Sequence, residues 1–248
     1  MPLNLRHLWI CILLLRSTTL LAQDSQPSPA LALEAGFGGF SIGPVDRGYI
    51  RDEYFSNVVV FDNDLTGDFF TEYVGARVQW LLLDETAAFS TGLRYTATYT
   101  TIRRAPYFFF LHGTSGTTTD YLAIKKLAEQ SHYVGVPIEI STFFTRENGG
   151  RMYVRGGCEL SYRIATSFHV DFHTPSMEMY EADVEKIIGK SNTLFVSAWV
   201  GGGVRMGPRR NFTLGFSVPF VLSKEFSSIN EVRTNVRLEL QYVFGKAL

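Results

Sequence analysis

The sequence predicts an all-β protein, an eight-stranded antiparallel up-and-down transmembrane β-barrel. Three observations lead to this prediction. Apolar and polar residues alternate with a period of two over eight long stretches, the pattern of extended strands with two unlike faces. The connections between the stretches alternate between short and long, as in up-and-down barrels. None of the six lysines falls inside an expected strand.

The eight expected strands are long for a water-soluble protein, whose strands usually have about five or six residues. About 9–11 tilted residues cross a bilayer, which explains the length. In the longest stretch, residues 151–170, all even-numbered residues are expected to face lipid and all odd-numbered ones the interior. The eight stretches cover residues 31–38, 73–82, 87–99, 134–144, 151–170, 194–206, 211–220 and 235–244.

The connections divide into two groups that alternate along the chain. The short ones contain Gly, Pro, Asn or acidic residues, which suit tight turns. Both chain ends then lie on the side of the short turns, which is the periplasmic side in outer-membrane barrels. The short connections are 84–85, 146–150 and 207–210, and the long ones are roughly 44–70, 103–131, 171–190 and 222–231.

The composition of the polar face indicates that it lies inside. A soluble, lipocalin-like barrel would also alternate, with its apolar face inward, but its polar face would carry lysine. Here that face carries Gly, Ser, Thr and Ala around sparse Arg and Glu, which suits a narrow bore. The lysines, expected only in loops or at the terminus, are Lys125, Lys126, Lys186, Lys190, Lys224 and Lys246. Aromatic residues expected to form girdles on the lipid face are Tyr99, Phe144, Phe168, Phe212, Phe220, Tyr242 and Phe244.

The beginning of the chain predicts export. Residues 1–22 combine basic residues, a short apolar run and a small residue at the end, as in a secretory signal peptide. A membrane anchor is the alternative, but the apolar run is too short to span a bilayer. Residues 23–29 then form a short linker, and 30–248 the barrel domain of the bacterial outer membrane. Cys158 is the one cysteine left after residue 22, so no internal disulfide is expected.

Charged residues on the inner face are expected to pair, because an unpaired charge in a narrow bore is costly. We expect a structural ion-pair network that fills the lumen; a gated path for protons or ions is the alternative. One hydrogen-bonded cluster should join Arg155, Glu159 and Arg163 with Glu139 and Arg205. The full set of lumen charges is Glu34, Arg77, Arg94, Glu139, Arg155, Glu159, Arg163, Arg205, Arg237 and Glu239.

Four short motifs resemble the PorT-like outer-membrane β-barrel family. They are the strand HYVGVPIEI at 132–140, the glycine pair at 156–157, GGGV at 201–204 and the closing LQYVFG at 240–245. The resemblance spans the chain after residue 22 and implies an eight-stranded outer-membrane barrel. It also implies a link to protein secretion, which is associated with the founding member. The chain departs from the family by ending four residues past Phe244 rather than on an aromatic residue.

One cluster of ligand-type side chains follows the longest strand. His169, Asp171 and His173 have i, i+2, i+4 spacing and would hold a transition metal if the strand continued. The alternative, which we favour, is a polar strand tip that enters an external loop. We therefore expect no metal, no other cofactor and no catalytic residues, because no nucleophile and base can be placed together.

Two of the long connections contain further signals. Residues 176–188 predict a short capped helix with an apolar stripe, which either packs on the barrel rim or binds a partner. The aromatic run at 107–111 either extends a hairpin or contacts a ligand. The stripe residues are Met177, Tyr180, Val184, Ile187 and Ile188.

These features predict a non-enzymatic surface or scaffold barrel that binds a partner through its long loops. A narrow channel for small solutes or ions is the second hypothesis, and an outer-membrane enzyme is the third. The expected partners are outer-membrane lipid, the barrel-assembly machinery and another envelope protein. A net charge of −1 gives no reason to expect nucleic acid.

Overall fold

The computed structural model describes nine segments: residues 29–44, 58–59, 66–83, 86–115, 118–145, 151–188, 193–207, 211–222 and 236–244. The expected signal peptide, 1–22, lies outside these residues, as does all of the expected linker except residue 29. The turns expected at 84–85 and 146–150 are outside them too. The domain boundaries therefore stay predictions.

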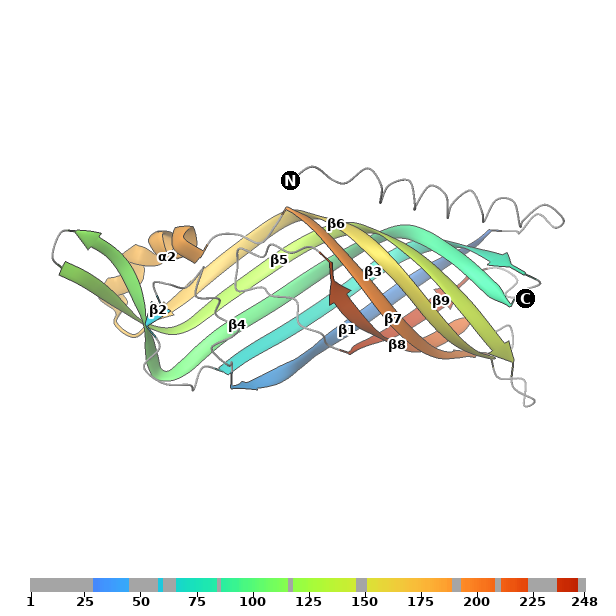
Figure 1. The fold of residues 1–248 in the computed structure, drawn as a ribbon, viewed down its shortest axis with the longest axis horizontal. Helices are drawn as coiled ribbons and strands as arrows, with labels where there is room; N and C mark the ends of the chain where they lie inside the picture. The colour runs from blue at the N-terminus through green and yellow to red at the C-terminus, as the bar shows by residue number, and fades with distance from the viewer. Residues whose placement is uncertain are drawn as a thin grey trace.

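Eight of the described strands form a closed antiparallel ring, which confirms the predicted all-β, eight-stranded up-and-down barrel (Figure 1). Consecutive ring strands pair with each other, and β9 returns to pair with β1. The ring strands are β1 (Ala30–Pro44), β3 (Thr66–Leu82), β4 (Ala87–Ser115), β5 (Thr118–Thr145), β6 (Arg151–Phe172), β7 (Leu194–Met206), β8 (Phe212–Val221) and β9 (Arg237–Val243). A short strand, β2 (Val58–Val59), pairs with β4 beyond the ring.

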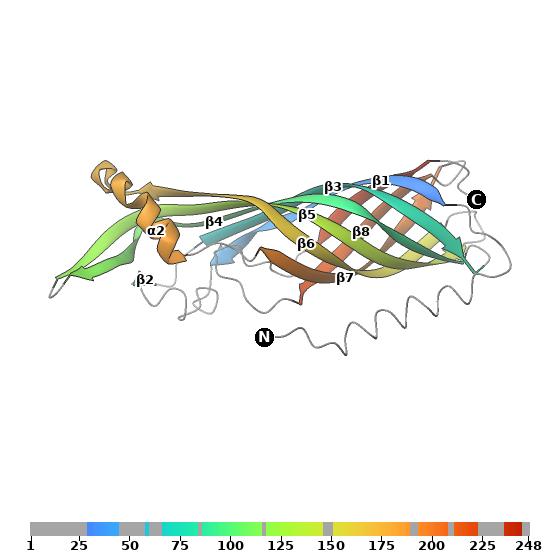
Figure 2. The ribbon, with the colours of Figure 1, turned by 90° about the horizontal axis from the view of Figure 1, so that it is seen from above.

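Three strands continue well beyond the others. β4, β5 and β6 have 29, 28 and 22 residues, whereas β8 and β9 have 10 and 7. Figures 1 and 2 show the three strands projecting past one end of the ring, the end beside which α2 lies. We call this projecting part, residues 101–128 of β4–β5 and 165–172 of β6, the outer extension. The expected loop at 103–131 is therefore wrong, because nearly all of it belongs to the β4–β5 hairpin.

Irregular pairing explains why the sequence pattern missed this hairpin. The β4–β5 register shifts between Arg103 and Phe108 and again between His112 and Thr114. Each shift interrupts the period of two on which the strand prediction depended. The aromatic run 107–111 continues the hairpin, one of the two alternatives predicted for it. Lys125 and Lys126 consequently lie in a strand, contrary to expectation, but in its outer extension.

The wall of the ring is apolar outside and polar inside. Every ring strand exposes large apolar side chains on one face, while Arg, Glu, Ser and Thr on the other face are buried. Examples of the exposed residues are Leu33, Val74, Leu93, Ile140, Val154, Val200, Phe216 and Leu240. Water-soluble proteins bury such residues, so this barrel has the polarity of a protein surrounded by lipid.

A β-bulge reverses this polarity along β6. Tyr133 of β5 pairs with Arg163, and the next residue, His132, pairs with Ala165, so Ile164 has no partner. From there on, even-numbered residues of β6 face inward, and Val170 is buried opposite the buried Leu127. The expectation that every even-numbered residue of 151–170 faces lipid is right up to Ile164 and wrong beyond it. An inserted residue turns all later side chains to the other face.

The outer extension has a small apolar core of its own. Leu122, Ile124, Leu127 and Phe172 are buried there, whereas Lys125, Ser167 and His169 are exposed. This is the arrangement of a surface in water. Because it begins where the apolar outer band ends, the reversal marks the boundary at which a membrane would give way to solvent. Phe168 shares the inward face with buried Glu129, so its expected place in the lipid girdle is wrong.

The predicted helix follows β6 as two pieces. A 3-10 helix, η2 (Pro175–Tyr180), leads into α2 (Glu181–Ile188), beside the outer extension (Figures 1 and 2). Both pieces contact β6, and Val184 of the predicted stripe is completely buried. Met179 is 77% exposed and lies outside the predicted stripe. Among the residues that the structure describes, no helix is long and apolar enough to cross a membrane.

Candidate functional site

The bore of the ring contains the charged residues predicted for it. Alternation within each strand places them there, because odd and even positions point to opposite sides of the wall. Arg163, next to the bulge, is partly exposed. The other nine are buried: Glu34, Arg77, Arg94, Glu139, Arg155, Glu159, Arg205, Arg237 and Glu239.

Glu34 of β1 is one centre of ion pairing in the bore. Its carboxylate lies 2.6 Å from Nη2 of Arg77 and 2.9 Å from Nε of Arg94. Arg94 Nη2 also donates to Glu34 at 3.1 Å, so this pair is bidentate. Nη1 of the same arginine donates to Glu159 at 2.6 Å. One guanidinium thus links carboxylates from β1 and β6.

Glu139 of β5 is the second centre. Its Oε2 lies 2.9 Å from Nη1 of Arg77 and 3.2 Å from Nη1 of Arg155, and accepts a 3.3 Å hydrogen bond from Nε1 of Trp199. Arg155 also contacts Glu239 of β9. Two arginines and an indole therefore converge on one buried carboxylate.

Together these contacts form one chain of seven residues with alternating charge. The order is Glu239–Arg155–Glu139–Arg77–Glu34–Arg94–Glu159. It joins six of the eight ring strands, all except β7 and β8. We call these seven residues the bore network. Each arginine in it contacts two carboxylates, which offsets the desolvation of its charge.

The bore network differs from the cluster predicted for β5–β7. Arg155 does contact Glu139, as expected. Glu159, however, pairs with Arg94 from β4, and Arg205 donates to Gln79 at 2.8 Å. A long arginine in a bore only about two side chains wide reaches past the neighbouring strand, so pairs across the lumen replace pairs along the wall.

Inward aromatic side chains cover glycines that are their cross-strand partners on the neighbouring strand. A Cβ on Gly36 would lie 2.4 Å from the ring of Tyr73, and one on Gly157 would lie 2.6 Å from the ring of Trp199. The ring of Tyr73 also lies 4.3 Å from the guanidinium carbon of Arg94, in cation–π geometry. The glycines thus make room for rings that fill the bore and hold the arginines in place.

Several bore residues were not predicted. Buried Arg151 and Gln79 occupy odd positions in expected strands, so the same alternation contained the signal for them. Buried Glu129 fell in the expected loop at 103–131, where the strand pattern is broken. Tyr73 and Trp199 occupy inward positions too, and aromatic residues on the inward face were the missed signal.

The structure separates the three candidate metal ligands. His169 and Asp171 share the outward face of β6, with Nε2 of the imidazole 2.9 Å from the carboxylate. His173 follows the end of the strand, and its backbone N–H donates to Ala123. Nδ1 of His169 instead lies 3.0 Å from Glu181 of α2. No group of three or more His, Cys, Asp or Glu within the described segments is arranged to hold a metal ion.

The chain matches no protein-family model and no curated protein. Among solved structures it is similar to the translocator domain of the autotransporter NalP from Neisseria meningitidis, with 8% identity and a TM-score of 0.35. That match covers 98% of this chain and 96% of the other. It is also similar to the Yersinia pestis outer membrane protein Ail in a phospholipid bilayer nanodisc, with 12% identity and a TM-score of 0.26. That match covers 88% and 100% of the two chains.

Such low identities and TM-scores carry no argument about activity, so the fold assignment rests on the strand pairing described above. The class that the fold and bore define is a closed eight-stranded barrel with an apolar exterior and an ion-paired interior. The resemblance to the PorT-like family stays a prediction.

Proposed function

We propose that this protein is an exported outer-membrane barrel without enzymatic activity, which serves as a surface or scaffold protein. The observation that carries the membrane placement is the reversal of polarity at Ile164. On β5 and β6, outward side chains are apolar below this level, as at Val134 and Tyr162, and polar above it, as at Ser167 and His169. A barrel folded for membrane insertion should migrate differently on gels before and after boiling. Mature protein that stays soluble in water without detergent would contradict the proposal.

The bore network favours a closed barrel over a channel. Three arginines and four glutamates, with the rings of Tyr73 and Trp199, occupy the middle of the lumen. An eight-stranded ring leaves room for little beyond its own side chains. Purified protein in planar bilayers should therefore show negligible conductance. A reproducible large-pore current would favour the alternative function, a channel for small solutes or ions.

The outer extension is the part that we propose binds a partner. At this end of the ring, the β4–β5 hairpin and the end of β6 lie beside the η2–α2 segment, and we include that segment in the proposed binding surface (Figure 2). Met179 is exposed on this segment, although Val184 anchors it. The resemblance to the PorT-like family adds the expectation that the partner belongs to the cell envelope or to secretion.

Crosslinking in intact cells tests this assignment. Photoreactive residues at Met179 and Ser167 should capture the same envelope protein, whereas one at Leu33 on the membrane face should not. Capture from the membrane face alone would move the binding surface away from the outer extension. Hydrolysis of an ester or peptide by the purified protein, with a nucleophile and a base side by side on the outer extension, would instead favour an enzyme.

A further inference from the structure

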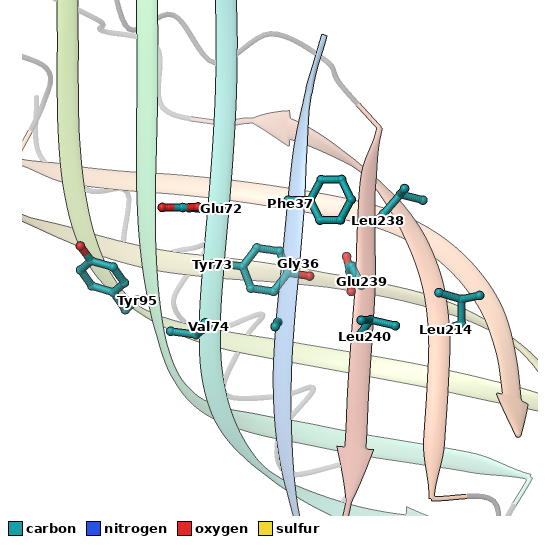
Figure 3. Close-up of a pocket in the computed structure, with 11 residues that line it drawn as sticks. Gly36, Phe37, Glu72, Tyr73, Val74, Tyr95, Leu214, Leu238, Glu239 and Leu240 are labelled. Atoms are coloured by element: carbon teal, nitrogen blue, oxygen red, sulfur yellow. The ribbon is translucent and has the colours of Figure 1, made fainter. Parts of the chain in front are cut away.

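The outer wall of the ring has a groove next to β1. It has a volume of about 540 Å³, and Figure 3 shows the side chains that line it. Eight of its eleven lining residues are exposed on the outward face. Cross-strand pairing explains the shape. The small side chain of Ala35 lies between Val74 and Leu240, whereas Phe37 stands in the row above it. The exposed lining residues are Ala35, Phe37, Glu72, Val74, Tyr95, Leu214, Leu238 and Leu240.

One end of the groove is charged. Glu72 is exposed beside Phe37, one outward row below Phe70, which is exposed and pairs with Tyr99. Four residues further along β3, beyond Phe70 and outside the groove, Asp68 is ion-paired with Arg103 at 3.0 Å. Glu72 therefore lies two outward rows below a surface ion pair and one row below a pair of aromatic residues, close to the level at which an outer membrane would change from acyl chains to headgroups.

One tyrosine contacts this carboxylate, and a second lines the groove. The Tyr99 hydroxyl donates to Glu72 Oε1 at 2.9 Å. Tyr95, which lines the groove, has its hydroxyl 2.6 Å from Nδ1 of His132, and the two rings stack with centroids 5.9 Å apart. Tyrosines at this level are typical of the interfacial girdle of a membrane barrel.

In the part of the chain that the structure describes, Glu72 forms no ion pair. Its carboxylate accepts a hydrogen bond from the Tyr99 hydroxyl. A carboxylate at a membrane interface is partly desolvated, so a counter-charge from the surroundings stabilises it. The groove below it is lined mainly by apolar side chains, and its volume of about 540 Å³ is enough for part of an acyl chain. The carboxylate and the apolar groove together suit an amphiphile with a positively charged headgroup.

We propose that this groove binds a lipid with a primary ammonium headgroup, such as phosphatidylethanolamine. The acyl chain lies against Ala35, Val74 and Leu240, and the ammonium group donates hydrogen bonds to Glu72. A trimethylammonium headgroup has no N–H to donate, and an anionic headgroup is repelled by the carboxylate. This inference depends on the membrane placement proposed above.

The test uses the full mature chain reconstituted with equal amounts of phosphatidylethanolamine, phosphatidylcholine and phosphatidylglycerol that have identical acyl chains. Native mass spectrometry then counts the lipids that stay bound after transfer to detergent. The wild type should retain phosphatidylethanolamine over phosphatidylcholine by about threefold, the size expected for one partly exposed ionic hydrogen bond. Retention at the bulk ratio, or a preference for phosphatidylglycerol, would overturn the inference.

Three variants locate the site. Glu72→Gln should return the retained lipids to the bulk ratio, whereas Asp68→Asn, which removes a carboxylate outside the groove, should leave the preference unchanged. Ala35→Leu fills the groove from the exposed face and should lower total retention. Loss of preference in Asp68→Asn alone would place the site elsewhere.

Heat-modifiable migration separates two kinds of failure. If the wild type does not insert into bilayers, the proposed membrane function fails. If it inserts but shows no headgroup preference, only the lipid site fails. Should Glu72→Gln not fold, Ala35→Leu and the wild-type ratio still decide the question.

Discussion

The carboxylate of Glu139 lies 2.9 Å from the guanidinium of Arg77, although β4 separates their strands in the ring. Neither residue is the direct cross-strand partner of the other. Glu139 faces Ser90 and Gly157, and Arg77 faces Ala32 and Gly92. Those neighbours are small, and the space they leave lets the charges meet over the intervening strand. The bore network consists largely of such contacts.

Removal of a single carboxylate should destabilise the barrel more when that carboxylate contacts more arginines. Glu139→Gln withdraws charge from Arg77 and Arg155, and Glu159→Gln withdraws it from Arg94 alone. Breaking a buried ion pair by removing one partner typically costs about 3–5 kcal/mol. We expect Glu139→Gln to lie in that range and Glu159→Gln to cost less. The urea midpoint of folded barrel in detergent measures both.

Glu178→Gln is the matched control for these two variants. Glu178 lies exposed in η2, where a single charge contributes about 0–1 kcal/mol. Equal midpoints for Glu159→Gln and Glu178→Gln would show that the bore charges are solvated. The assignment of the polar face to a filled lumen would then be wrong.

Two adjacent glycines of β6 should differ in their tolerance of substitution by alanine. A Cβ on Gly157 would lie 2.5 Å from the carbonyl oxygen of Ile138 and 2.6 Å from the ring of Trp199. On Gly156 its nearest neighbour would be 3.8 Å away. Overpacking costs about 1–3 kcal/mol, so Gly157→Ala should lower the urea midpoint and Gly156→Ala should not. Similar midpoints would mean that Trp199 does not rest on this wall.

The bulge at Ile164 predicts which residues near the outer boundary meet water. In a Cys158→Ala background, Ser167→Cys should react with a membrane-impermeant maleimide on intact cells. Phe168→Cys should stay protected, because it faces Glu129 inside. Without the bulge, the alternation of the first half of β6 would exchange these two results. Reaction at residue 168 and protection at residue 167 would thus refute the register.

Glu181 should hold the η2–α2 segment against β6. Its carboxylate oxygen lies 3.0 Å from Nδ1 of His169 and accepts a 3.0 Å hydrogen bond from the backbone N–H of Val170. Glu181→Ala removes both contacts and should speed protease cleavage within residues 175–188, at a global cost of about 1 kcal/mol or less. Glu178→Ala, on the same segment, should be cleaved like the wild type. Equal cleavage of both would assign the anchoring to Val184.

The sequence by itself determined the number of ring strands, their order and the inside and outside of the ring wall. These properties depend on alternation, which is local. A residue such as Val74 or Leu240 needs lipid, and its neighbour in the chain must then point into the bore. Nine of the ten predicted lumen charges are buried for this reason. The helix expected at 176–188 was predicted too, from its apolar period. The cap expected at Ser176 was wrong, because the segment begins as a 3-10 helix at Pro175 and its N-cap, Thr174, makes no side-chain cap hydrogen bond.

Tertiary structure alone decided the partners within the bore and the faces beyond Ile164. The pairing of Arg94 with Glu159 depends on the diameter of the ring, which no pair of neighbouring positions encodes. The bulge that turns Phe168 inward is a single inserted residue in the pairing of β6 with β5. An isolated β6 would show the same alternation with or without it. Register is a relation between two strands, and only the closed ring sets it.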